Sequence, residues 1–339
     1  MNTLNDVARL AGVSSMTVSR VINNSGHIGP ETRAKVNQAI VELGYMPNVL
    51  ARQLRSKRTK TIALVLTDIT NPFFTTIARG VEDTARAQGY AVMFCNTDES
   101  EAEEIEYVRM LIQRRVDGIL LVPATDSSGS LQLLHKHGLP VVVLDRHVRS
   151  GQVDEVRTDS EAGAYLAIRH MIDLGHRRIA VLTGPADVST SMDRVAGYRR
   201  ALAEESLEPD SRYILFGEYN DASGFEMTQR ILAARPRPTA LFAANNFIAF
   251  GAIEALREAG LSIPEEMSIA VFDDLPQGWV FDPFLTVVSQ PAYEIGRRAT
   301  ELMLERLTGE APAEPRTIVL PSELIARRST APPRREATA

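Results

Sequence analysis

Polar side chains stand directly after several apolar runs in the larger, second part of this 339-residue chain. Asp145 follows LPVVVL, Asn245 follows ALFAA and Asp273 follows SIAVF. Because ligands of open parallel α/β sheets bind beyond the carboxyl ends of the strands, we expect these side chains to share one cleft. Carboxylates, amides and arginine bond to neighbouring hydroxyls in pairs, and aromatic rings stack on apolar sugar faces. The mixture predicts a site for a sugar or a related polyol.

The predicted ligand site contains nine residues. They are two phenylalanines after the first apolar run, a threonine and an arginine leading into a helix, and polar or aromatic residues at strand ends: Phe73, Phe74, Asp145, Thr190, Arg194, Tyr219, Asn245, Asp273 and Gln290. Simpler structural roles remain open for several of them. Asn245 can cap the following helix, Arg194 can form a surface ion pair, Asp273 can cap a strand end, and the phenylalanines can belong to the core.

The first 60 residues are basic, although the chain as a whole is acidic. They contain nine Lys/Arg and three Asp/Glu, a net charge of +6, whereas the whole chain carries −6. A basic segment joined to an acidic body is typical of a nucleic-acid-binding module attached to another domain. Charge alone also allows a basic, solvated face that has no partner.

Two short helices joined by a glycine turn are predicted at the start of this basic segment. Thr3 to Asp6 forms a variant of the capping box, and Gly12 tolerates the positive φ that a tight turn needs. Ser14 can cap the next helix, SSMTVSRVIN, and Pro30 stands at the first position of a third helix. Two helices joined in this way and supported by a third form a helix-turn-helix.

The second of these helices has one apolar and one polar face. Val18, Val21 and Ile22 recur at i, i+3 and i+4, so they form an apolar stripe that faces inward. The opposite face carries Ser15, Met16, Ser19 and Arg20. A recognition helix reads base edges in the major groove with such exposed side chains.

The segments LNDVARLAGVSSMTVSRVIN, ETR and GYMPNVLARQLRS resemble the lactose-repressor/galactose-repressor family of bacterial regulators. The resemblance covers the first 60 residues closely and continues through most of the chain. It implies a cytoplasmic, nucleoid-associated repressor that binds a near-palindromic double-stranded operator as a homodimer and responds to a small molecule. It also places twelve residues on DNA: Thr3, Ser14, Ser15, Met16, Thr17, Ser19, Arg20, Asn23, Tyr45, Asn48, Arg52 and Leu54.

The residues of this set have different implied roles. Ser15, Met16 and Arg20 stand where the family's specificity residues stand; Arg20 can contact guanine O6 and N7, and Met16 can contact a thymine methyl group. Thr3, Ser14, Thr17 and Tyr45 are expected to contact phosphates and so to position the protein. Leu54 matches a leucine that the family inserts between base pairs in the minor groove. The alternative is that Leu54 is an ordinary core residue of a longer helix.

Apolar runs of strand length alternate with helical stretches from residue 61 onward. The first set is TIALVLTD, YAVMFCNTD, VDGILLVPA and LPVVVLDR; the second is EVRT, RRIAVLTG, YILFGE, PTALFAA and SIAVFDD. Continuous apolar strands between helices predict parallel sheets covered on both faces. The repeat predicts two similar lobes. The expected fold class is therefore an all-α helix-turn-helix head followed by an α/β, two-lobed sensor, which resembles the periplasmic sugar-binding fold.

The predicted organisation has four parts. Residues 1–47 form the helix-turn-helix domain, and residues 48–59 form a hinge helix or linker. The ligand-sensor and dimerisation domain spans 60–330, with an N-lobe at about 60–160 and 290–322 and a C-lobe at about 161–289 and 323–330. Residues 331–339 are polar and contain proline, so they predict a disordered tail.

Other classes of protein have little support. The N-terminus lacks a signal-peptide pattern, no apolar run has the length of a membrane span, and Cys95 has no second cysteine with which to pair. The motifs GxGxxG, GxxxxGK[ST] and GxSxG are missing, so we expect neither enzyme activity nor a cofactor. His135 and His137 lack further ligands at metal spacing and are interpreted as surface residues.

Two departures from the family pattern bear on the effector. The chain has Asn246 where the family usually has aspartate, so a role that needs a carboxylate there is absent. It has Val188 where the purine-repressor branch has arginine, which argues against a nucleobase ligand. Two other functions remain alternatives: control by a phosphocarrier protein instead of a sugar, and a sugar-binding transport protein, which would need a signal peptide and no DNA-binding head.

Overall fold

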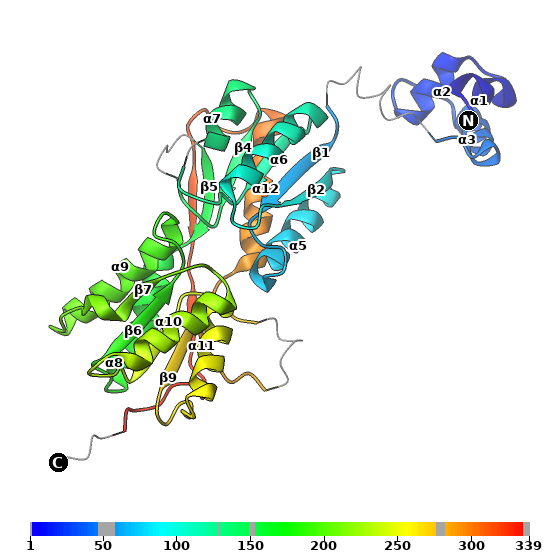
Figure 1. The fold of residues 1–339 in the computed structure, drawn as a ribbon. Coiled ribbons are helices and arrows are strands. Elements are labelled where there is room, and N and C mark those ends of the chain that lie inside the picture. The colour runs from blue at the N-terminus through cyan, green and yellow to red at the C-terminus, as the bar shows by residue number, and fades with distance from the viewer. Residues whose placement is uncertain (1, 47–57, 128, 149–152, 276–281, 335–339) are drawn as a thin grey trace, which may run out of the picture. The chain divides into compact units, whose positions relative to one another are not determined.

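The computed structural model describes residues 2–46, 58–127, 129–148, 153–275 and 282–334. The chain forms two compact units, which divide after Thr59. The smaller unit is called the head and the larger unit the sensor (Figure 1). No described helix has the length and apolar character needed to cross a membrane.

Within its described residues, 2–46, the head is a bundle of three helices. These are α1 (Leu4–Ala11), α2 (Ser15–Ile22) and α3 (Pro30–Leu43). Side chains from all three helices form its core, namely Val7, Ala8, Val18, Val21, Val36 and Ala39. Burial of such small aliphatic groups is the main source of stability in a unit of this size.

The predicted helix boundaries of the head are confirmed. Thr3 and Asp6 form a reciprocal capping box at the start of α1, and Gly12 ends this helix with φ 66°. The Ser14 hydroxyl accepts a hydrogen bond from the Thr17 amide and so caps α2. Pro30 is the first residue of α3, where its missing N–H group costs no helical hydrogen bond.

The N-lobe of the sensor contains a six-stranded, all-parallel sheet in the order β11-β5-β4-β3-β1-β2. Its strands are β1 (Thr61–Leu66), β2 (Ala91–Asn96), β3 (Gly118–Leu121), β4 (Val141–Leu144), β5 (Asp154–Thr158) and β11 (Thr317–Leu320). Its helices are α5 (Pro72–Ala87), α6 (Glu101–Arg114), α7 (Gly129–Lys136) and α12 (Ala292–Thr308). Helix α12, which comes late in the chain, packs beside α5 (Figure 1).

The C-lobe repeats this architecture with the order β12-β10-β9-β8-β6-β7. Its strands are β6 (Ile179–Thr183), β7 (Ile214–Phe216), β8 (Ala240–Ala243), β9 (Ser268–Phe272), β10 (Thr286–Ser289) and β12 (Glu323–Ile325). Of these described strands, only β12 is antiparallel to its neighbour. Its helices are α8 (Ser160–Asp173), α9 (Ser189–Glu204), α10 (Asp221–Ala233), α11 (Asn246–Glu258) and the short 3-10 helix η1 (Ser211–Tyr213). The predicted fold class is confirmed.

The chain crosses between the lobes three times. The crossings lie between β5 and α8, between β10 and α12, and between β11 and β12. The run EVRT, which begins the second set of apolar runs in the sequence, becomes β5 and pairs with β4 and β11 in the first sheet. Each lobe is thus built from segments that are separated in the sequence.

Strand β2 differs from its sequence-based prediction. The apolar run YAVMFCN predicts a strand buried on both faces, yet Phe94 is 43% exposed and only Cys95 of this strand is buried. The strand lies at the edge of the sheet, where only one neighbour covers it. An edge position cannot be inferred from an apolar run, because it depends on strand order.

The segment after β12 is held against the C-lobe. The amide of Ala331 donates to the Ser268 hydroxyl (3.0 Å), and its carbonyl accepts from the His176 ring (2.9 Å). His176 is buried and also bonds to Thr239 at 2.8 Å. The prediction of a disordered tail is therefore wrong at Ala331, because a buried histidine of the C-lobe fixes this residue.

Helices α5 and α12 pack unusually closely, because a glycine stands on each of them at the contact. A Cβ atom at Gly80 would lie 2.2 Å from the Tyr293 carbonyl oxygen, and one at Gly296 would lie 2.1 Å from the Ile77 carbonyl oxygen. No side chain fits at either position unless the helices separate.

We predict that Gly296→Ala destabilises the sensor by about 1–3 kcal/mol, because the added methyl group forces α12 away from α5. Urea unfolding of the full chain, followed by circular dichroism, measures this effect. Gly129→Ala is the matched control, since its Cβ would lie no closer than 3.5 Å to any atom outside its local backbone. Equal stability of the two variants would contradict the packing argument.

Candidate functional site

The carboxyl ends of the two sheets border a small cavity of about 40 Å³ between the lobes. Its lining comes from both lobes and comprises Asp68, Asn71, Phe73, Phe74, Glu99, Asp145, Arg146, Thr190, Arg194, Tyr219, Asn245 and Asp273. Eight of the nine residues predicted for the ligand site belong to this lining. The ninth, Gln290, donates to the Asp273 carboxylate at 2.6 Å.

Asp145 and Arg146 follow β4 and are both buried. Asp145 adopts φ 64°, so the chain turns sharply at the strand end. Its Oδ1 atom makes no hydrogen bond within the described structure. Burial raises the pKa of Asp145, although the neighbouring Arg146 and Arg194 partly oppose the rise. The Oδ1 atom of the buried Asp145 can thus accept a hydrogen bond from a ligand.

Glu99, which lies in the segment after β2, holds Arg146 in place. Its carboxylate accepts from Nη1 at 2.6 Å and from Nη2 at 2.7 Å. Nη1 also donates to the carbonyls of Pro123 (2.8 Å) and Ala124 (3.0 Å). Burial lowers the pKa of Arg146, but Glu99 outweighs this effect and raises it. The guanidinium is therefore kept charged and immobile.

Four residues of the cleft lining are absent from the predicted set of nine, namely Asp68, Asn71, Glu99 and Arg146. Arg146 and Asn71 stand next to or near predicted residues in the sequence. Glu99 follows the carboxyl end of β2, so the rule that identified Asp145 and Asp273 also identifies it. Its neighbourhood, TDESEAEE, has the composition of a solvated helix start, which conceals the signal.

Arg194 projects from α9 into the cleft. Its Nη1 donates to the Ala244 carbonyl at 2.5 Å, and the guanidinium carbon lies 3.9 Å from the centre of the Phe272 ring. It is buried, which excludes the surface ion pair considered as the alternative. Its Nε atom makes no hydrogen bond within the described structure.

Asp273 follows β9 and, like Asp145, lines the cleft. It is buried, adopts φ 79°, and accepts a hydrogen bond from Gln290. Burial raises the pKa of Asp273 from 3.8 to about 6, and Asp145 adds to the rise, while Arg194 and Gln290 oppose it. A carboxyl group of this kind changes its charge close to neutral pH.

Tyr219 closes one side of the cleft. Its hydroxyl bonds to the Ser191 hydroxyl at 2.7 Å and to the Thr190 hydroxyl at 3.2 Å. A Cβ at Gly184 would lie 2.3 Å from the tyrosine ring, so only glycine fits beneath it. Thr190 and Tyr219 thus position each other at the start of α9.

Two of the predicted positions also have structural roles. Asn245 caps α11 by accepting from the Ile248 amide at 2.8 Å, as the alternative interpretation states. Phe73 and Phe74 belong to the N-lobe core, with edge-to-face rings 5.1 Å apart, and they also line the cleft.

Direct contacts hold the two lobes together around the cleft. Asn246 donates from Nδ2 to the Asn71 side chain at 3.2 Å, which an aspartate at this position could not do when ionised. His147 bonds through its amide to Ser189 at 3.1 Å and through its ring to Asp193 at 3.4 Å. The cleft is therefore closed by polar contacts that separation of the lobes would break.

Five buried polar atoms in or beside the cleft make no hydrogen bond to other described atoms. Two are donors, the Nε atoms of Arg146 and Arg194, and three are acceptors, Asp145 Oδ1, Asn246 Oδ1 and Gln290 Oε1. Buried polar groups without partners are costly, and native structures rarely retain them without reason. The arrangement suits a ligand that offers both donors and acceptors over a short distance.

The head residues that are predicted to contact DNA include exposed side chains and side chains with local structural roles. Ser15, Met16 and Arg20 are exposed on α2, with Met16 65% exposed. Others have local structural roles: Ser14 caps α2, the Asn23 side chain bonds to the Ser19 carbonyl at 2.8 Å, and Tyr45 packs against the head core. Asn48, Arg52 and Leu54 lie outside the described residues. The exposed face of α2 is free to enter a DNA groove.

His135 and His137 are exposed, as predicted. Within the described part of the chain, no three His, Cys, Asp or Glu side chains are grouped so that they could hold a metal ion.

Two family models match the chain. Residues 3–48 match the bacterial regulatory proteins of the lacI family, and residues 59–328 match the periplasmic binding proteins and sugar-binding domain of the LacI family. The HTH-type transcriptional repressor PurR of Vibrio atlanticus (strain LGP32) is 37% identical over 328 residues, which cover 96% of this chain and 98% of that protein.

Solved structures agree with these matches. The lac repressor dimer bound to operator and the anti-inducer ONPF superposes with a TM-score of 0.87 at 28% identity, covering 97% of this chain and 99% of that chain. A LacI family transcriptional regulator from Enterococcus faecium with bound ribose has a TM-score of 0.72 at 35% identity, covering 80% and 99% of the two chains.

We predict that Asp273 makes the stability of the sensor depend on pH. A carboxyl whose folded pKa lies near 6 stabilises the fold at low pH, and this contribution of about 3 kcal/mol is lost as pH rises from about 4 to about 6. Asp273→Asn removes the effect, so its free energy of unfolding should rise relative to wild type across this window. Chemical unfolding at pH 4.5, 5.5 and 7 measures the difference. A difference that does not vary with pH would rule out the raised pKa.

Proposed function

Because the chain belongs to the LacI family of bacterial regulatory proteins, we propose that its effector is a small carbohydrate held between the two lobes of the sensor. The chain is a DNA-binding transcriptional repressor under the control of a bound ligand. We further propose that the chain binds DNA in the cytoplasm as an assembly of two copies.

The observation that carries the proposal is the group of five polar atoms in or beside the cleft that make no hydrogen bond to other described atoms. A sugar hydroxyl donates one hydrogen bond and accepts others, so adjacent hydroxyls can satisfy Asp145 and Gln290 as acceptors and Arg146 and Arg194 as donors. Phe73, Phe74 and Tyr219 supply ring faces or edges at the same cavity. Apolar sugar faces stack on such rings.

Two further observations support a sugar over a nucleobase. Val188 is buried at the N-terminal cap of α9, where it offers no hydrogen bond to a ring nitrogen or carbonyl. A relative of similar fold contains bound ribose. The cavity of about 40 Å³ is far below the roughly 300 Å³ of a small ligand pocket, so we infer that the lobes separate to admit the effector.

On the DNA side, we propose that α2 reads the major groove through its exposed residues. Arg20 contacts guanine and Met16 contacts a thymine methyl group, while Thr3, Ser14 and Thr17 lie near phosphates. Residues 48–59 act as the hinge, with Leu54 as the wedge in the minor groove. Ligand binding changes the relation of the lobes and so the spacing of two hinges, which alters operator affinity.

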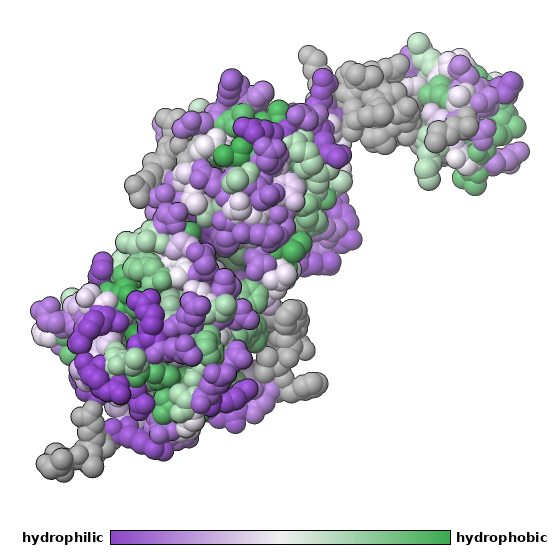
Figure 2. Space-filling view, in the orientation of Figure 1, coloured by the Kyte–Doolittle hydropathy of each residue, from purple (hydrophilic) through white to green (hydrophobic). Residues whose placement is uncertain are grey.

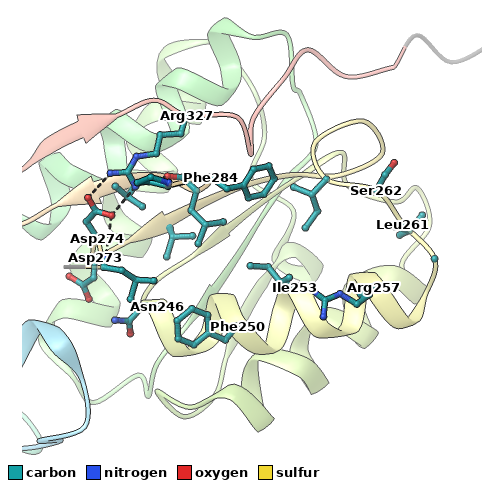
Figure 3. Close-up of a pocket in the computed structure, with 17 residues that line it drawn as sticks. Asn246, Phe250, Ile253, Arg257, Leu261, Ser262, Asp273, Asp274, Phe284 and Arg327 are labelled. Carbon is teal, nitrogen blue, oxygen red and sulfur yellow. Dashed lines mark hydrogen bonds and ion pairs between the residues drawn. The ribbon is translucent and has the colours of Figure 1, made fainter. Parts of the chain in front are cut away.

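We propose that two chains pair through their sensors. An apolar pocket of about 590 Å³ lies on the C-lobe, beside α11. Figure 3 shows Phe250 and Ile253 on one side of this pocket, Phe284 on the other, and the Asp274–Arg327 ion pair at one end. Phe250 is 39% exposed. On the face drawn in Figure 2, hydrophobic residues form separate patches among hydrophilic ones. A concave apolar surface such as this pocket suits contact with a second chain.

The effector class is tested by a thermal-shift screen of the full chain against sugars, sugar phosphates, sugar acids, polyols and nucleosides. We expect a carbohydrate to stabilise the protein by about 2.7 kcal/mol at 100 times Kd, a shift of several degrees, and to change its operator affinity in a gel-shift assay. A nucleoside as the only hit would overturn the proposal. Absence of any hit would favour control by a protein partner instead.

Arg194→Ala should weaken binding of that carbohydrate by at least about tenfold, because it removes a buried donor from the cleft. Operator affinity without effector should be retained. Arg200→Ala is the control on the same helix, since Arg200 is exposed and pairs with Glu161. If both variants respond to the effector like wild type, Arg194 does not belong to the site.

Phe250→Asp should shift the sensor from dimer to monomer, because a charge in the apolar contact would lose its water. Sedimentation measures the change from twice the chain mass of 37.3 kDa to that mass. Leu166→Asp is the control, as Leu166 is 37% exposed on α8. A dimer that survives Phe250→Asp would place the pairing surface elsewhere.

A further inference from the structure

We propose that the sensor rests with its lobes closed when no effector is bound, and that a hydrogen bond between the side chains of Asn71 and Asn246, called here the amide clasp, holds it closed. Asn71 belongs to the N-lobe and Asn246 to the C-lobe. The inference goes beyond the proposed function and does not depend on the chemical class of the effector. It names the contact that an effector must break in order to enter.

The cap of α5 fixes the direction of the hydrogen bond in the clasp. Asn71 is the N-cap residue of this helix, and its Oδ1 atom accepts a hydrogen bond from the Phe73 amide at 3.0 Å. The same oxygen lies 3.2 Å from Nδ2 of Asn246. Asn246 must therefore present its donor group here, because its own oxygen in this place would bring two acceptors into contact.

Both asparagines are almost inaccessible to solvent while the lobes are closed. Asn71 is 4% exposed and Asn246 is 2% exposed. Water does not compete for a hydrogen bond at such a position, so the bond is stronger than one on the surface. The Oδ1 atom of Asn246 has no partner among the described atoms. Separation of the lobes would hydrate this oxygen, so the clasp can be released as well as formed.

The clasp ties one side of the cleft, and other contacts tie the opposite side. Asn246 begins α11, which packs with α10 over one face of the C-lobe sheet, whereas α8 and α9 pack over the other face. At the start of α9, the His147 amide donates to the Ser189 hydroxyl at 3.1 Å, and the Asp126 amide donates to the Asp187 carbonyl at 3.0 Å. Loss of the clasp would leave the lobes tied at the α9 side alone, so they could tilt apart at the α11 side.

A resting closed state limits how an effector enters. The cavity of about 40 Å³ admits a ligand only in those molecules in which the lobes have separated. The apparent affinity for the effector is therefore lowered by the fraction of molecules that are open. Asn71 itself lines the cavity, so a donor group on the effector can replace Asn246 as the partner of Oδ1 and so release the clasp.

Two isosteric substitutions test the clasp, because they add the same charge at its two ends. In Asn246→Asp, the ionised carboxylate faces the Asn71 oxygen, so the hydrogen bond cannot form and the lobes should separate at this side. In Asn71→Asp, the carboxylate can still accept from both Phe73 and Asn246, so the lobes should stay closed. Each variant buries one added carboxylate on closure. The difference between them therefore reports the direction of the hydrogen bond.

The measurement is the distance between spin labels on the two lobes, obtained by double electron–electron resonance on the full chain without sugar. The labels replace the exposed residues Ala87 on α5 and Gln229 on α10, and Cys95, the only cysteine in the sequence, is changed to alanine in every sample. Labelled chains are mixed with an excess of unlabelled chains, so that each distance lies within one chain. We expect wild type and Asn71→Asp to be closed, and Asn246→Asp to raise the ratio of open to closed molecules by at least about tenfold.

Each possible result decides for or against the clasp. Equal distance distributions in Asn246→Asp and Asn71→Asp would overturn it, whether both variants are open or both are closed. A wild-type chain that is mainly open without sugar would also overturn it. If Asn246→Asp does not fold, Asn246→Ala removes the donor without adding a charge and should open the lobes in the same way; closed lobes in that variant would count against the clasp.

Discussion

The parallel direction of the strands is the constraint on which the sensor depends. Because neighbouring strands run the same way, the loops that follow them gather at one edge of each sheet. Three chain crossings then place these two edges against each other, so residues from opposite ends of the sequence share one cavity. Much of the cleft lining is both buried and polar. Its arginines and carboxyl groups are stable there because each has hydrogen-bonded or charged neighbours.

Sequence patterns predict much of this arrangement. Apolar runs locate the strands, and the rule for strand ends identifies Asp145, Asn245 and Asp273 from the order of residues alone. The N-terminal caps of α1 and α2 can also be predicted from the sequence, because Thr3 and Ser14 accept hydrogen bonds from backbone amides only three residues away. These predictions succeed because the interactions behind them are local.

The predictions that miss depend on tertiary contacts. The exposure of Phe94 follows from the edge position of β2, which its own residues do not encode. The contact of Ala331 with His176 joins residues 155 positions apart. Glu99 is not predicted as a cleft residue, because its acidic neighbours in the sequence are typical of a solvent-exposed helix start. Its partner Arg146 is also 47 positions away. The role of Asn246 is visible only in its hydrogen bond to Asn71 on the other lobe.

The interleaving of the two lobes has a consequence for how the protein is made. The N-lobe sheet needs β11, and its α5 surface needs α12, so this lobe cannot be completed until about residue 320 has left the ribosome. The C-lobe likewise waits for β12. The head, in contrast, has its whole core within the first 45 residues. During synthesis the head can therefore fold early, while both halves of the sensor acquire their last elements almost together, near the end of translation.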